Sequence, residues 1–181
     1  RRTGTFAGRK IEKFRLHAIQ VCLWCRSLIG KGRFAAIRAA WPAEKPISVR
    51  ISANDWIENG ITPEDAVEIA KAFKLAGCDI LDVSSGQVVS EEEPEYGRLF
   101  QLPFSDRIRL EADMPTMTVG NIQSYADANS IIASGRGDIC VIARMHLFDP
   151  YWTRHAAKEL GYDLAMPVQY KAVEDYTPRW V

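Results

Sequence analysis

Two arginines and one glycine stand where the chain could bind an anionic group. Arg50 lies inside the β-branched run 47–52, where an unpaired guanidinium would be costly to bury. It therefore lies at the surface, pairs with a carboxylate, or points at a negative region of a ligand. Arg144 ends the apolar run 139–143, and Gly120 closes the run 116–119. A guanidinium beside free backbone amides suits a phosphate dianion, although a terminal arginine of a strand can equally be solvated.

The other candidates for chemistry are three histidines and a lone C-x-x-C: His17, His146, His155, Cys22 and Cys25. The histidines have no metal-ligand spacing and no nucleophile partner, so we expect structural roles for them. No second cysteine pair completes a set of four zinc ligands, and no thioredoxin pattern surrounds the C-x-x-C. We expect these two thiols on a helix, without chemistry. The sequence predicts neither a metal site nor a catalytic residue.

Composition limits the partners. The chain has 181 residues, with 23 basic and 23 acidic side chains and no net charge. This length holds one domain, or one domain and a tail. The charge balance argues against a nucleic-acid partner and a polybasic membrane patch, and no apolar run reaches the roughly 20 residues of a membrane span.

Free thiols at Cys78 and Cys140 suit a reducing compartment, so we expect a cytoplasmic protein. Because the chain opens on Arg1, without a leader pattern, we expect a piece of a longer protein.

Four apolar runs of strand length, each followed by a helical pattern, organise the chain. The predicted strands are 47–52, 79–84, 116–119 and 139–143, and the predicted helices end at 41 or cover 62–77, 104–112, 125–133 and 149–161. Thr62 is the expected N-cap of its helix, with Pro63 at the first helical position and Asp65 completing a near capping box. Ser124 and Asp149 are expected to cap later helices. Residues 87–104 form a long polar loop.

Strands that alternate with helices and are apolar on both faces predict a parallel sheet covered by helices. Either an open doubly wound sheet or a (β/α)8 barrel would satisfy this pattern. No G-x-G-x-x-G follows any strand, so the dinucleotide-binding fingerprint is absent. Polar or glycine residues instead follow each strand at its carboxyl end, where barrel enzymes place their chemistry. The pattern therefore favours a (β/α)8 barrel or a part of one.

Five motifs resemble the C-terminal half of the old yellow enzyme family: VRISANDW, ILDVSSG, TVGNI, DICVIAR and FDPYW. The resemblance covers about residues 34–170 and is greatest to the family's NADPH dehydrogenase-like branch. Within that branch, RMHLFDPYWTRHAAKELGY and the ending PVQY…YTPRW are similar to the reductase part of anthraniloyl-CoA and salicylyl-CoA monooxygenase proteins.

The resemblance implies strands five to eight of an FMN-binding (β/α)8 TIM barrel, with NADH or NADPH as hydride donor. The family's arginine that approaches flavin N1 and the C2 carbonyl falls on Arg50, where its positive charge would ease flavin reduction. The residues that hold the FMN phosphate fall on Gly120, Ala143 and Arg144. Ala143 replaces a glycine of the family, and its backbone N–H still suits the phosphate unless the position needs a positive φ.

Other departures from the family are larger. Residues 4–33 do not fit its pattern, so the expected domains are a divergent segment 1–33, a half-barrel 34–162 and an extended tail 163–181. The family's substrate-binding histidines, its proton-donating tyrosine and its first flavin loop belong to strands one to four. A half-barrel leaves two unpaired edges, so we expect a missing half-barrel or a second subunit to complete it. Tyr176, Arg179 and Trp180 could also dock on another subunit.

We therefore expect an FMN-binding fragment of an NAD(P)H-dependent flavin oxidoreductase. The intact enzyme would act on a small-molecule substrate, an activated alkene or an aryl-CoA. The alternative is a non-catalytic truncated remnant without bound flavin. A third possibility, an aldolase-like barrel, would require a lysine at the carboxyl end of a strand, and the predicted strands contain none.

Overall fold

The computed structural model describes residues 5–6, 9–10, 19–22, 28–173 and 176, and the side chains of residues 32–173 and 176. The chain divides into two compact units, Arg1–Ile142 and Ala143–Val181, which are described separately below. The domain limits expected from the sequence stay a prediction. Four residues with predicted roles lie outside the described part: His17, Cys25, Arg179 and Trp180.

The centre of unit 1 is a five-stranded parallel sheet in the order β3-β4-β5-β6-β7. Its strands are β3 (Ile19–Cys22), β4 (Ile47–Ser52), β5 (Ile80–Ser84), β6 (Thr116–Thr118) and β7 (Ile139–Cys140). Every strand pairs with its neighbours in sequence, whereas a doubly wound sheet reverses its order at a switch point. The strand order therefore agrees with part of a barrel. β3 is an addition to the four predicted strands and comes from a segment that the sequence left unassigned.

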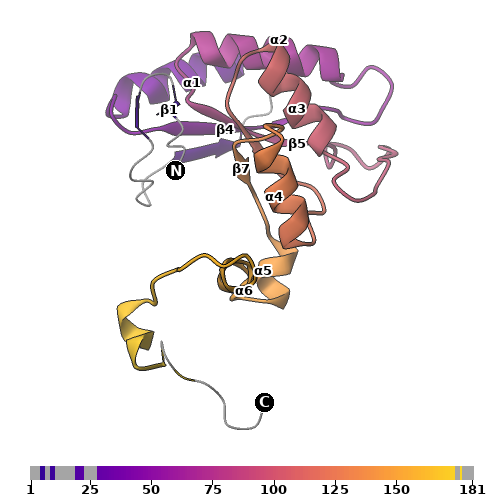
Figure 1. The fold of residues 1–181 in the computed structure, drawn as a ribbon. Helices are drawn as coiled ribbons and strands as arrows, with labels where there is room; N and C mark the ends of the chain where they lie inside the picture. Colours follow the sequence, from indigo (N-terminus) through magenta and orange to yellow (C-terminus); the bar gives the residue numbers. More distant parts are fainter. Residues whose placement is uncertain (1–4, 7–8, 11–18, 23–27, 174–175, 177–181) are drawn as a thin grey trace. The chain divides into compact units, whose positions relative to one another are not determined.

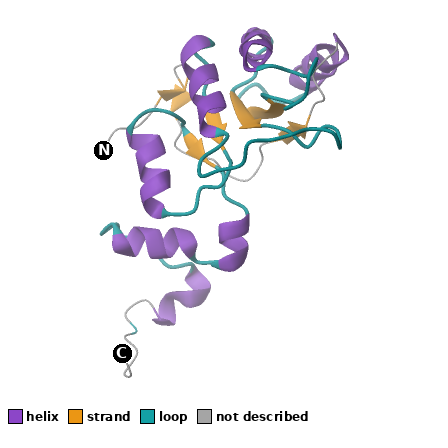
Figure 2. Cartoon of the chain, turned by 90° about the vertical axis from the view of Figure 1, so that its right-hand side faces the viewer, coloured by secondary structure: helices purple, strands orange, loops and turns teal. Residues whose placement is uncertain are grey.

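Helices connect the strands of unit 1 in regular alternation, and Figure 2 colours the helices purple and the strands orange. They are α1 (Leu28–Ala40), α2 (Pro63–Leu75), α3 (Leu102–Glu111) and α4 (Tyr125–Ala133). Figure 1 shows α1, α2 and α3 on the same side of the sheet, as right-handed crossovers between consecutive parallel strands require. The capping boxes of Thr62 with Asp65 and of Ser124 with Asp127 are both present, which confirms the predicted starts of α2 and α4.

The two faces of the sheet differ in character. Ile47, Val49 and Ile51 of β4 belong to a buried apolar cluster that includes Phe34 of α1 and Phe73 of α2. Because successive side chains of a strand point to opposite faces, the intervening positions of β4 and β5 lie on the face turned away from these helices. The polar residues at those positions are Ser48, Arg50, Ser52, Asp82 and Ser84.

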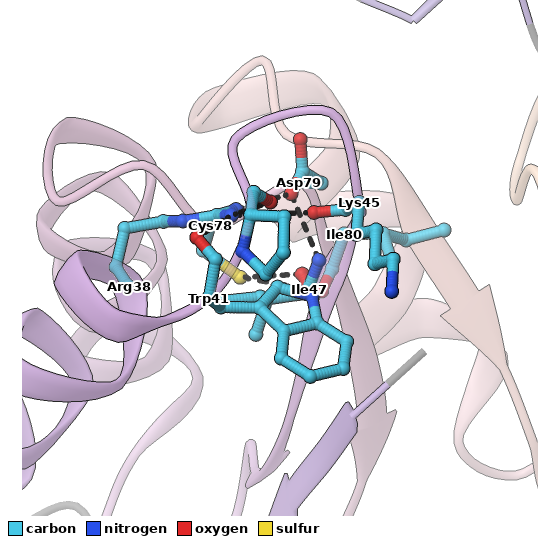
Figure 3. A network of polar contacts seen from close by, with 8 residues as sticks. Arg38, Trp41, Lys45, Ile47, Cys78, Asp79 and Ile80 are labelled. Carbon is cyan, nitrogen blue, oxygen red and sulfur yellow. Dashed lines mark hydrogen bonds and ion pairs between the residues drawn. The ribbon is translucent and has the colours of Figure 1, made fainter. Parts of the chain in front are cut away.

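At the amino end of the sheet, Arg38 and Asp79 join α1 to the starts of two strands (Figure 3). Arg38 Nη1 donates to Asp79 Oδ2 at 3.3 Å, and the same oxygen accepts the backbone N–H of Ile47 at 2.9 Å. Arg38 also donates to the carbonyl oxygens of Trp41, Pro42 and Lys45. We call this arrangement of an arginine, an aspartate and a strand N–H a clasp.

A second clasp repeats the arrangement two strands later. Arg109 of α3 donates to both oxygens of Asp138, at 3.0 and 3.2 Å, and Asp138 accepts the N–H of Thr116 at 3.0 Å. In both clasps the aspartate immediately precedes one strand and accepts the first N–H of the strand before it. The amino end of the sheet therefore carries structural ion pairs.

Unit 2 contains α5 (Arg144–Phe148), α6 (Trp152–Glu159) and a 3-10 helix, η1 (Val168–Val173). Three expectations were wrong here. The strand predicted over 139–143 ends at Cys140, so Arg144 begins a helix instead of ending a strand. Asp149 is not the N-cap of α6: Tyr151 is, and Asp149 accepts the Tyr151 N–H at 3.0 Å. The tail is not wholly extended, because η1 lies within it.

Two smaller features complete the fold. β1 (Thr5–Phe6) and β2 (Arg9–Lys10) form a separate antiparallel pair. Cys22 ends β3, so the prediction that it lies on a helix was wrong. Within the described residues, no helix has the length and apolar character needed to cross a bilayer.

Candidate functional site

Arg50 lies beside Asp82 on the polar face of the sheet. The two residues are register partners on the adjacent parallel strands β4 and β5. Arg50 Nη1 lies 3.6 Å from Asp82 Oδ2, and Arg50 Nε donates to Ser84 Oγ at 3.4 Å. Ser84 Oγ in turn donates to the carbonyl oxygen of Ile51 at 3.0 Å. The structure shows the pairing with a carboxylate, and a contact of Arg50 with a ligand stays a prediction.

This pairing does not use all the hydrogen-bonding capacity of Arg50. The Arg50 side chain is 36% exposed, whereas the Asp82 side chain is 2% exposed. A guanidinium has five N–H donors, and 3.6 Å is longer than a usual hydrogen bond. Donors on the terminal nitrogens therefore remain for a ligand at the carboxyl half of β4.

The loop after β4 is rigidly built by its own side chains. Ser52 Oγ donates to Asp55 Oδ1 at 2.8 Å, and the N–H of Ile61 donates to Asp55 Oδ2 at 2.8 Å. Asp55 is buried, and Asn54 accepts the N–H of Trp56. These bonds hold the polar end of β4 in one conformation, which suits a preorganised binding site.

Gly120 is the glycine that closes β6, and its backbone has a φ of +110°. A Cβ built there would lie 2.9 Å from Gln101 Cβ, closer than side chains tolerate. A glycine is therefore needed for packing against Gln101, whether or not a ligand approaches. The Oε1 atom of Gln101 is buried and accepts no hydrogen bond from the described residues.

The turn after Gly120 is joined to the loop before α3. Asn121 Nδ2 donates to the Gly97 carbonyl oxygen at 3.0 Å, and Arg98 donates to the buried carboxylate of Asp127. Burial by itself raises the pKa of Asp127, but hydrogen bonds from Arg98, Ser124 and Gln123 outweigh it, so the pKa lies below its usual 3.8. The Asp127 charge thus helps to fix the loops at the carboxyl end of the sheet.

Ala143 and Arg144 follow β7 and belong to unit 2. Ala143 has a φ of −114°, so the position does not need a glycine. Arg144 is exposed and makes no hydrogen bond or ion pair within the described part of the chain. Its guanidinium is available to an anion.

His146, His155, Cys78 and Cys140 have structural surroundings. His155 Nδ1 lies 2.7 Å from Asp149 Oδ2, and the His146 ring packs edge-on against Trp152. Burial raises the pKa of the Cys78 thiol to about 12 and that of Cys140 to about 11. Both thiols are therefore protonated at neutral pH and are poor nucleophiles. No cluster of metal-ligating side chains occurs among the residues with described positions.

Sequence reasoning missed Asp82 and Gln101 as members of this site. Asp82 had a usable signal, because a carboxylate inside the apolar run ILDVS needs a cationic partner as much as Arg50 needs an anionic one. Gln101 had none, since it lies in a polar loop and its closeness to Gly120 arises from the tertiary fold. Chemically, the carboxyl end of unit 1 offers a partly exposed guanidinium and an unpaired amide oxygen. It can bind a polar, negatively charged ligand.

Solved structures show the same fold. The chain matches 2-naphthoyl-CoA reductase with a TM-score of 0.64 and 24% identity, over 73% of this chain and 20% of that one. It matches histamine dehydrogenase from Rhizobium sp. 4-9 with a TM-score of 0.61 and 21% identity, over 75% of this chain and 20% of that one. At these identities the likeness concerns the fold alone, an α/β fold with a parallel sheet that covers part of a barrel.

Sequence relatives are closer. An NADPH dehydrogenase of Geobacillus sp. (strain WCH70) is 43% identical over 136 residues, which are 75% of this chain and 39% of the relative. An NADPH dehydrogenase of Halalkalibacterium halodurans is 36% identical over 170 residues, 94% of this chain and 46% of the relative. The chain thus spans less than half the length of these curated relatives.

Residues 34–163 match the family described as NADH:flavin oxidoreductase / NADH oxidase. The match confirms the family predicted from the motifs, whose cofactors are FMN and NAD(P)H. The match begins at residue 34, directly after the divergent segment 1–33. The chain belongs to the NADH:flavin oxidoreductase / NADH oxidase family.

Proposed function

We propose that the chain is the FMN-binding part of an NAD(P)H-dependent flavin oxidoreductase. The observation that carries the proposal is the family match over residues 34–163, which includes Arg50 on the polar face of the sheet. Bound FMN would supply hydride transfer between NAD(P)H and an acceptor. The residues of this chain would bind and orient the flavin, and we assign no catalytic residue to it.

The described residues fit a flavin at the carboxyl end of unit 1. Arg50 has donors left over from Asp82 and Ser84, and these suit the electron-rich N1 and C2 carbonyl region of the ring. A positive charge there stabilises the negative charge that accumulates on reduction. The buried Gln101 Oε1, which accepts no bond from the described residues, could accept one from a hydroxyl group of the ribityl chain.

We propose Gly120, Ala143 and Arg144 as the ligands of the FMN phosphate. Gly120 and Ala143 would contribute backbone N–H groups, and Arg144 a guanidinium. The assignment rests on the family motifs TVGNI and DICVIAR. The exposed Arg144 side chain and the negative φ of Ala143 agree with it.

We further propose that β4 to β7 are strands five to eight of a barrel that other strands complete. The sheet of unit 1 ends at β3 and β7, whose outer edges pair with no other described strand. Unpaired parallel edges are exposed to aggregation. The remaining strands of the barrel, from a longer form of the chain or from a second subunit, would cover them.

The acceptor that we propose for the completed enzyme is an activated alkene or an aryl-CoA. The aryl-CoA suggestion rests on the motif RMHLFDPYWTRHAAKELGY in α5 and α6. Cys78 and Cys140 are free thiols, which suits a reducing compartment such as the cytoplasm.

A second candidate is a non-catalytic remnant that binds no flavin. In this candidate the matched part, which corresponds to 39% of the Geobacillus relative, would not bind flavin by itself.

Flavin binding separates these two candidates. The purified chain should show flavin absorption bands after gel filtration with FMN, and it should quench FMN fluorescence in a titration. Arg144→Ala should weaken FMN binding about tenfold or more, the loss expected for one charge-assisted contact to phosphate. Arg33→Ala, at an exposed arginine of α1, is the matched control and should leave the affinity unchanged. A colourless chain without quenching would favour the remnant.

A further inference from the structure

The polar face of the sheet contains a buried carboxylate, Asp82, beside the guanidinium of Arg50. Asp82 is 1% exposed, and its register partner on β6 is the apolar Met117. Its neighbours Leu81 and Val83 face the apolar core. A buried ion pair is often no more stabilising than an apolar residue of similar size. Stability alone is therefore a weak reason for an aspartate at this position.

Asp82 and Ser84 together restrict the guanidinium of Arg50. Asp82 Oδ2 lies 3.6 Å from Nη1, and Ser84 Oγ accepts from Nε at 3.4 Å. Both partners lie on β5, so they draw the side chain of Arg50 from β4 across to its neighbour. Ser84 Oγ is itself oriented by its bond to the Ile51 carbonyl oxygen. A long, flexible side chain is thereby given one direction on the open face of the sheet.

We propose that Asp82 is a positioning residue for Arg50: it orients the guanidinium so that the free N–H donors meet the flavin ring. This inference rests on the proposed function, because it takes FMN as the ligand of Arg50. It assigns to Asp82 a role in binding that acts through another side chain. Orientation in advance lowers the conformational entropy that Arg50 loses on binding, and so it raises affinity.

The test compares FMN affinities, measured by fluorescence quenching, across a double-mutant cycle. Asp82→Leu should weaken FMN binding about tenfold, as expected when one charge-assisted hydrogen bond is misaligned. Asp82→Asn keeps an acceptor oxygen and should weaken binding less than about threefold. In the Arg50→Met background, Asp82→Leu should cause no further loss, because the residue that it positions is absent.

Ser84→Ala is a second variant. It removes the hydrogen bond between Arg50 Nε and Ser84 Oγ and leaves the buried charge of Asp82 in place. It should weaken FMN binding in the wild-type background and have no effect in the Arg50→Met background. Urea unfolding of each variant reports stability separately. A structural role for Asp82 would lower the urea midpoint and leave the FMN affinity of the folded protein unchanged.

The outcomes are distinct. If the wild-type chain binds FMN and Asp82→Leu binds it equally well, the positioning role is wrong and the proposed function stands. An equal loss in both backgrounds would mean that Asp82 acts without Arg50, which also overturns the inference. A wild-type chain that binds no FMN overturns the proposed function and this inference together.

Discussion

Gly120 packs directly against the side chain of Gln101, so that a Cβ at position 120 would lie 2.9 Å from Gln101 Cβ. The contact joins the end of β6 to the start of α3. It explains this glycine by packing within the protein, independently of any ligand. The explanation can be tested by stability measurements.

Gly120→Ala should lower the free energy of unfolding by about 1–3 kcal/mol, because the alanine meets both a strained φ and a close contact. Urea unfolding followed by circular dichroism measures the change. Gly97→Ala is the control, since a Cβ there meets nothing within 4 Å. Equal stability of the two variants would contradict the packing explanation.

The clasps predict where stability is concentrated. Asp79→Ala removes the acceptor of both Arg38 and the Ile47 N–H, and it should cost about 2–4 kcal/mol of unfolding free energy. Asp138→Ala should have a similar effect through Arg109 and Thr116. Asp106→Ala removes an aspartate whose ion pair with Arg136 is partly exposed, and it should cost about 0.2–1 kcal/mol. Chemical denaturation of the three variants side by side would refute the idea if Asp106→Ala were as damaging as the others.

The raised pKa of Cys78 predicts a loss of stability at alkaline pH. Its thiol has an ordinary pKa of 9.0, and burial raises the pKa to about 12 in the folded protein. As the pH rises above 9, the unfolded chain therefore loses this proton first, and the folded state becomes less stable. Cys78→Ala should show a smaller decrease in urea midpoint between pH 8 and pH 10.5. Parallel decreases in both proteins would assign the effect to other groups.

The lowered pKa of Asp127 predicts that stability falls at acidic pH. Its folded-state pKa is lowered below 3.8, so its contribution to stability is present above that pH and is lost as the pH falls through the folded-state pKa. Asp127→Asn should be less stable at neutral pH and should lose less stability on acidification. The control is Asp113→Asn, at an almost fully exposed residue whose pKa is lowered by Lys74. In acid titrations followed by circular dichroism, Asp113→Asn should lose almost the same stability as the wild-type protein.

Local patterns in the sequence predicted the elements whose signals are local. Thr62 and Ser124 were expected as N-caps, and each forms a capping box. Such signals involve residues a few positions apart, so tertiary contacts rarely overturn them. The same reasoning placed β4, β5 and β6 to within about one residue.

The failures have physical causes. Asp149 has the right residue type for an N-cap, but its carboxylate binds the Tyr151 N–H and His155, so the helix begins later. The run 139–143 is apolar enough for a strand, yet the ladder with β6 ends at Cys140. Pairing length depends on the partner strand, which no single segment encodes.

The candidate site was predictable in part. Arg50 was identified because a cation inside an apolar run requires an explanation. The pairing with Asp82 depends on the register of two strands whose start points the sequence fixes only approximately. Gln101 reaches Gly120 through the course of a long loop, which leaves no periodic trace in the residues.

The two clasps give the sheet a modular character. Each fastens one helix and two strands, and no clasp crosses the stretch between β5 and α3. A crossover for recombination with a relative, or new termini for a circular permutant, would therefore separate whole modules if placed at residues 87–98. A breakpoint inside α2 or α4 would instead place the arginine and the aspartate of one clasp on different segments.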